Sequence, residues 1–123
     1  MTGIFDGLSA KDTRRVHAAG TSVRLPRDWS PIHERTPADK AYILLEGEAS
    51  VRRGGQEVAR LGPGDVFGEA GLVNHKLRNA SIVTTTPVRA LHFTAEQLER
   101  LCADVPAFRS ALDRAAQERL GTT

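Results

Sequence analysis

The chain is poor in cysteine, and it lacks a long apolar run. Cys102 is the only cysteine among 123 residues, which excludes an internal disulfide and favours a reducing compartment. No apolar stretch approaches membrane-spanning length, and the N-terminus has no apolar core of the kind found in signal peptides. These absences predict a cytoplasmic protein with no membrane partner.

The chain also lacks a large excess of charge of one sign, and it lacks a pattern of metal ligands. The net charge is +2, which is too small to predict direct binding to nucleic acid. His17, His33 and His92 share no spacing typical of metal ligands, so neither a metal site nor a resident cofactor is predicted. Aromatic residues make up only 5% of the chain, so its core must rest on aliphatic side chains.

The length and the turn signals together indicate the fold class. A chain of 123 residues is long enough for one domain with its own core, and we expect residues 1–123 to form a single domain. Short apolar runs separated by Gly and Pro turns predict about eight strands and a β-sandwich or barrel, not an α/β sheet. The expected strands are residues 21–25, 31–33, 39–46, 48–53, 56–61, 66–67, 80–85 and 88–93.

Helices are expected on both sides of these strands. A capping box from Ser9 to Asp12 begins a helix within 9–20, and Gly20 is expected to stop it. Two helices are expected within 94–121. A second capping box, from Thr94 to Gln97, begins the first of them, and the last helix starts near Pro106. Alternation in residues 39–46 places apolar side chains on both faces, so this strand should be buried on both sides.

One stretch, FGEAGLVNHKLRNASI from Phe67 to Ile82, carries chemistry suited to a sugar phosphate. Glu69 can accept hydrogen bonds from a ribose hydroxyl, and Arg78 can offer a forked, permanently charged donor to phosphate oxygens. Small residues allow backbone N–H groups to approach the anion closely. These small residues are Gly68, Ala70 and Gly71.

The same stretch resembles the phosphate-binding cassette of cyclic nucleotide-binding domains, F-G-E-L-A-L-x-x-x-x-P-R-x-A-T-V, without a gap. The resemblance implies that Glu69 binds the ribose 2′-hydroxyl and that Arg78 binds the cyclic phosphate. Backbone amides at Gly68, Ala70 and Gly71 would help to hold ribose and phosphate. The resemblance also implies a mainly β fold with flanking helices: an eight-stranded, jelly-roll-like β-roll over 21–93, with hinge and lid helices at 94–121.

The chain departs from the family pattern at several positions. Gly71 replaces an alanine and Leu77 a proline, although neither change removes a contacting group. Asn79, after the arginine, is at a position that can touch the purine in the family, and a plain strand residue is the alternative. Ser81 is a further candidate residue of the ligand site. Between residues 26 and 39 the usual glycines are replaced, at Asp28 among others, so those turns cannot be assigned from the pattern. Trp29, in this region, has no predicted function.

The sequence therefore predicts a stand-alone cyclic nucleotide-binding module that acts as a ligand-sensing regulatory protein and is not an enzyme. Ligand frequency within the family favours cAMP over cGMP. A protein effector, or a second copy paired through the C-terminal helix, is expected to receive the signal. Two alternatives remain: a ligand-free form of the fold used for protein interaction or dimerisation, and a cupin-type enzyme, which would require a His-x-His cluster.

Overall fold

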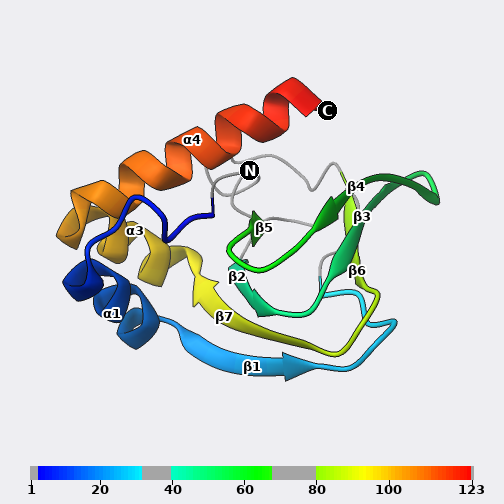
Figure 1. Cartoon of the computed structure of the whole chain (residues 1–123), viewed down its shortest axis with the longest axis horizontal. Helices are drawn as coiled ribbons and strands as arrows, with labels where there is room; N and C mark the ends of the chain where they lie inside the picture. The colour runs from blue at the N-terminus through cyan, green and yellow to red at the C-terminus, as the bar shows by residue number, and fades with distance from the viewer. Residues whose placement is uncertain (1–2, 32–39, 68–79, 123) are drawn as a thin grey trace.

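The fold consists of two antiparallel sheets with helices at one end (Figure 1). The computed structural model describes residues 3–31, 40–67 and 80–122, and side chains through Arg114. The four-stranded sheet has the order β1 (Thr21–Leu25), β7 (Val88–Thr94), β2 (Lys40–Glu46) and β5 (Val66–Phe67). The three-stranded sheet has the order β4 (Gln56–Leu61), β3 (Ala49–Arg53) and β6 (Ser81–Thr84).

Strand β2 separates two apolar cores, as its two-faced apolar pattern predicts. Ala41 and Ile43 belong to the helix-side core, which includes Leu91, Phe93, Val66 and the apolar side chains of the helices. Tyr42 and Leu44 belong to the inner core between the two sheets. Because successive strand residues point to opposite faces, one strand supplies both cores. The four-stranded sheet is thus covered by helices on one face and by the second sheet on the other.

The helices cover the helix-side core. They are α1 (Ala10–Ala19), α3 (Ala95–Asp104) and α4 (Pro106–Thr122). Both predicted N-caps form: Ser9 Oγ accepts from the Asp12 N–H at 3.1 Å, and Thr94 and Gln97 exchange both bonds of a capping box. Phe108 is completely buried where α4 packs against α3. No helix in the described part of the chain is long and apolar enough to span a membrane.

The strand count of eight is corrected to seven within the described residues. The strand expected at residues 31–33 does not begin at Pro31, which lies in a bend, while residues 32–39 lie outside the described ranges. Two features explain the difference. Proline has no N–H to donate to a ladder, and the residues before it form a tight turn that bonds to Thr84 and, through the Ser30 hydroxyl, to Ile82 O.

Two helix ends differ in detail from the sequence expectation. Gly20 does cap α1, but with φ −97° it is not left-handed; a side chain there would place Cβ 2.8 Å from the Phe93 ring. The glycine is required by close packing. Helix α4 continues through Gly121 to Thr122, although the sequence predicted that it stops at the glycine. Assignments of helix ends commonly differ by one or two residues, so this difference is small.

Candidate functional site

The predicted phosphate-binding stretch joins the two sheets at their edges. Strand β5, which ends at Phe67, is an edge of the four-stranded sheet, and β6, which begins at Ser81, is an edge of the three-stranded sheet. Six of the predicted site residues lie between these two ends and outside the described residues: Gly68, Glu69, Ala70, Gly71, Arg78 and Asn79. The structure therefore fixes the two ends from which these residues depart.

The entry to the stretch is a turn held from both sides. Gly64 donates its N–H to Leu44 O at 2.8 Å, and Leu44 returns a bond from its own N–H to Asp65 O at 2.8 Å. The Asp65 carboxylate accepts the Gly62 N–H at 2.8 Å. From the N-terminus, the Ile4 N–H donates to Gly64 O, also at 2.8 Å. These bonds fix the direction in which β5 delivers the chain to Gly68.

Three aromatic rings cross the four-stranded sheet in a row that ends beside the stretch. His92 on β7, Tyr42 on β2 and Phe67 on β5 are register partners on adjacent strands. Tyr42 stacks on Phe67 with ring centroids 4.9 Å apart, and His92 meets Tyr42 edge-on at 5.2 Å. Phe67 is almost completely buried in the inner core and directly precedes Gly68. The row anchors the last residue before the predicted site.

The exit from the stretch places Ser81 differently from its neighbours. Ala80 and Ile82 are buried in the inner core, between the two sheets. Ser81 lies between them in sequence and is half-buried. Alternation along β6 turns its side chain to the other face, on the side of its register partner Arg52. Ser81 is thus the one predicted site residue whose surroundings are described.

The turn after β1 forms despite the missing glycine of the family pattern. Asp28 adopts φ +62°, a left-handed conformation that Asp tolerates better than most residues. Thr84, buried in β6, holds this turn: its N–H donates to Trp29 O at 2.8 Å and its carbonyl accepts the Asp28 N–H at 2.9 Å. The Thr84 hydroxyl accepts the Trp29 N–H at 2.8 Å and donates to Pro26 O at 2.6 Å. The turn therefore covers the open edge of β6.

Three described titratable groups outside the stretch have shifted pKa values: Glu46, Cys102 and Glu57, the pKa of which is lowered by Ser50 and Arg60. A hydrogen bond from Arg89 at 3.0 Å, its charge and then that of Arg24 lower the pKa of Glu46. Burial raises the pKa of the Cys102 thiol, which packs against the helix-side core. A raised pKa keeps the thiol protonated near neutral pH and therefore unreactive. These shifts reflect structural contacts of the two sheets and of α3.

No group of three or more His, Cys, Asp or Glu side chains comes together as a possible metal site in the described part of the chain.

The comparisons with known proteins decide the family. The family model of the cyclic nucleotide-binding domain matches residues 22–105, from β1 to the end of α3. The chain belongs to this family. The predicted resemblance is confirmed, and with it the mainly β fold with an N-terminal helix and two C-terminal helices.

One relative is a transcriptional regulator. A CRP-like cAMP-activated global transcriptional regulator from Mycobacterium tuberculosis is 30% identical over 126 residues, which covers 98% of this chain and 56% of the relative. The chain therefore spans about half the length of that relative.

Solved structures show the same fold. The N-terminal domain of a transcriptional regulator from Streptomyces coelicolor A3(2) is 29% identical with a TM-score of 0.74, covering 95% of this chain and 87% of that one. The catabolite activator protein of Thermus thermophilus, at 24% identity, superposes with a TM-score of 0.85 over 97% of this chain and 58% of its own. The second comparison shows the fold alone.

Proposed function

We propose that this chain is a cyclic nucleotide-sensing regulatory module that binds cAMP noncovalently and catalyses no reaction. The observation that carries this proposal is the gapless motif from Phe67 to Ile82, set between the edges of two sheets in a chain of the cyclic nucleotide-binding family. A cAMP-activated regulator among the relatives supports cAMP over cGMP.

In the proposed site a carboxylate binds the ribose and a guanidinium binds the phosphate of the ligand. Glu69 accepts hydrogen bonds from the ribose, and Arg78 and nearby backbone N–H groups bind the cyclic phosphate. The backbone groups belong to Gly68, Ala70 and Gly71. Asn79 is the proposed contact to the purine, and Ser81 is a further proposed residue of the ligand site. Because Ser81 lies on the outer face of β6, we expect its truncation to have the smallest effect in this set.

The described surroundings support a preorganised site. The turn from Gly62 to Asp65 and the aromatic row fix the entry, and buried Ala80 and Ile82 fix the exit. A site whose ends are held by packed strands loses less conformational entropy when ligand binds. We propose that binding shifts α3 and α4, since α3 contacts β7, β2 and α4. The signal would pass to a protein effector, or to a second copy through α4.

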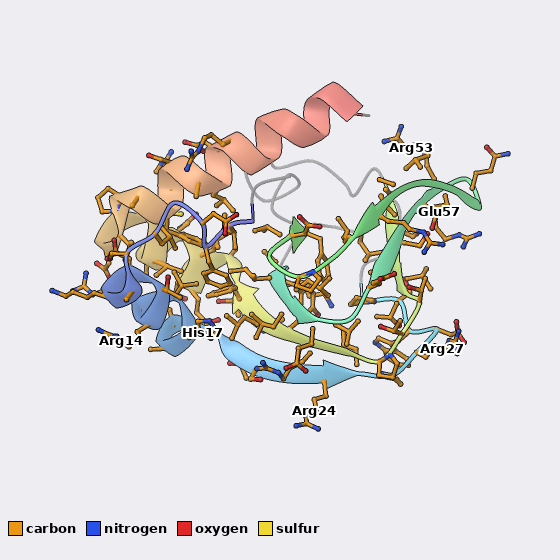
Figure 2. The ribbon with its side chains drawn as sticks, in the orientation of Figure 1. Arg14, His17, Arg24, Arg27, Arg53 and Glu57 are labelled. Carbon is orange, nitrogen blue, oxygen red and sulfur yellow. The ribbon has the colours of Figure 1, made fainter. Side chains whose placement is uncertain are left out.

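Calorimetry with four proteins tests the site. Hydrogen bonds to charged groups contribute about 1.5–3 kcal/mol, so Arg78→Ala and Glu69→Ala should each weaken cAMP binding about tenfold to a hundredfold. Arg78→Ala should lose more, because the phosphate carries the ligand's charge. Arg14→Ala is the matched control: Arg14 is exposed on α1 and points away from both sheets (Figure 2), and it should bind like the unaltered chain.

Two results would contradict the proposal. If the unaltered chain fails to bind either cAMP or cGMP at about millimolar ligand, the chain is a ligand-free form of the fold. If it binds but Arg78→Ala and Glu69→Ala retain full affinity, the family assignment stands and the site assignment fails.

A further inference from the structure

An exposed tryptophan on a fixed turn is the feature that nucleotide binding leaves unexplained. Trp29 is the only tryptophan of the chain, and its surface is 53% exposed. Among the described residues, the other exposed large apolar side chain is Val58, which has no register partner because it sits at an irregularity of edge strand β4. Val58 is accounted for by that irregularity, because such bulges protect sheet edges from further pairing. Among the described residues, no comparable strand irregularity accounts for the exposure of Trp29.

The backbone that presents Trp29 is held in place by hydrogen bonds to buried Thr84 and, through the neighbouring Ser30 hydroxyl, to Ile82 O at 2.9 Å. Thr84 is only 1% exposed and makes hydrogen bonds to Pro26, Asp28 and Trp29, so the turn is fastened over β6 at several points. Asp28 accepts a left-handed conformation within it. Backbone strain of this kind persists where the surroundings fix it, and it concentrates at binding segments. A fixed turn keeps the tryptophan available at low entropic cost.

The charged side chains near Trp29 indicate which chemical class of partner would bind there. Arg27, Asp28 and Trp29 are consecutive exposed residues, and Arg27 has no ion pair within the described ranges. Arg24 and Arg27 both point outward, from β1 and from the turn after it (Figure 2). A polyanion such as single-stranded nucleic acid needs several cations and aromatic rings in series, whereas this turn offers one aromatic ring and Arg27 beside Asp28. Trp and Arg together are instead typical of energetic centres in protein interfaces.

We propose that Trp29 and Arg27 form a docking surface for an acidic protein segment, separate from the nucleotide site. The segment would place one aliphatic or aromatic side chain against the Trp29 ring and a neighbouring carboxylate on the Arg27 guanidinium. This surface lies on the turn that covers β6, whereas the proposed ligand site lies between β5 and β6. Such a partner would receive the output of a sensing domain without occupying its ligand site.

Trp29 itself reports on the proposed contact. Because it is the only tryptophan, the emission of the chain measures this one side chain. The probe is a set of tryptophan-free peptides of about twelve residues, each with one Leu, Phe or Met among Asp and Glu, used at up to about 1 mM. Docking should shift the emission to shorter wavelengths and reduce quenching by iodide. Peptides with Lys in place of the acids should do neither.

Variants complete the test with fluorescently labelled peptide and anisotropy. Trp29→Ala should weaken peptide binding about tenfold or more, and Arg27→Glu should weaken it in a salt-dependent manner. Val58→Ala, which removes the other exposed apolar side chain, is the matched control and should bind normally. Trp29→Ala should bind cAMP like the unaltered chain, so failure here is distinguishable from failure of the nucleotide site.

Four results would overturn the proposal. The first is the absence of any emission shift with acidic peptides, and the second is an unchanged affinity of these peptides for Trp29→Ala. An oligothymidylate of about twelve nucleotides that binds as tightly as the best acidic peptide would indicate a nucleic-acid surface. An emission shift that grows with protein concentration in the absence of peptide would indicate that a second copy of this chain covers Trp29.

Discussion

Replacing Thr84 by valine tests how the turn from Pro26 to Trp29 is held. Valine has nearly the shape of threonine, so the change removes the hydroxyl and leaves the packing of β6 in place. The hydroxyl accepts the Trp29 N–H at 2.8 Å and donates to Pro26 O at 2.6 Å. Thr84 is only 1% exposed, so water cannot easily replace the lost partner. Both backbone groups of the turn would lose their bond at once.

The size of the effect follows from those two groups. A buried polar group left without its partner costs about 1–3 kcal/mol, and the two groups are only partly buried, so we expect about 2–4 kcal/mol in total. For a chain of 123 residues, each kcal/mol lowers the melting temperature by about 4 °C. Thr84→Val should therefore melt about 8–16 °C below the unaltered chain.

Urea unfolding and thermal melting measure this loss. Thr85→Val is the matched control, because the Thr85 hydroxyl makes one exposed bond at 3.2 Å to Glu48 O, which also accepts the Thr85 N–H. The control should lose less than about 1 kcal/mol. Iodide should also quench Trp29 more strongly in Thr84→Val. If Thr84→Val is no less stable than Thr85→Val, the turn is not held by this hydroxyl and the reasoning is refuted.

Three further predictions concern the framework around the site. Gly47→Ala should cost at least about 2 kcal/mol in urea unfolding, because Gly47 has φ +94° and its Cβ would collide with the backbone oxygen of Pro87. Gly62→Ala, whose Cβ would meet nothing within 4 Å, should be near neutral. Phe67→Ala should lower the free energy of unfolding by about 3–5 kcal/mol, and a smaller loss than about 1 kcal/mol would deny its place in the inner core. Glu46→Gln should slightly lower the melting temperature at every pH above 4.5, the ordinary pKa of glutamate, because Arg89 lowers the pKa of Glu46 in the folded chain. The difference in melting temperature should vanish as the pH falls through that lowered pKa. A difference that persists in strong acid would contradict this prediction.

Local signals in the sequence predicted much of this fold. The capping residues Ser9 and Thr94 and the Gly54-Gly55 hairpin act within a few residues, so their patterns predict structure directly. Strand β2 was predicted as buried on both faces because its two alternating sets are both apolar. In each case neighbours along the chain determine the structure.

The features that the sequence did not predict depend on contacts between distant residues. Thr84 holds Trp29 across 55 positions, and nothing near either residue indicates the partner. The row of His92, Tyr42 and Phe67 depends on the register of three strands. The close packing of Gly20 against the Phe93 ring likewise joins residues far apart in the sequence. The site residues from Gly68 to Asn79 remain predictions from motif and family.

A thermal melting scan against cyclic and linear nucleotides tests the central claim most directly. A ligand that binds only the folded chain raises the melting temperature, and cAMP at about one hundred times its dissociation constant should contribute about 2.7 kcal/mol. For 123 residues, this corresponds to a rise of about 10 °C. We predict a rise of this order with cAMP, a smaller one with cGMP, and none with linear AMP. Equal rises with the cyclic and linear forms, or no rise at millimolar cAMP, would contradict a cyclic nucleotide site built on Glu69 and Arg78.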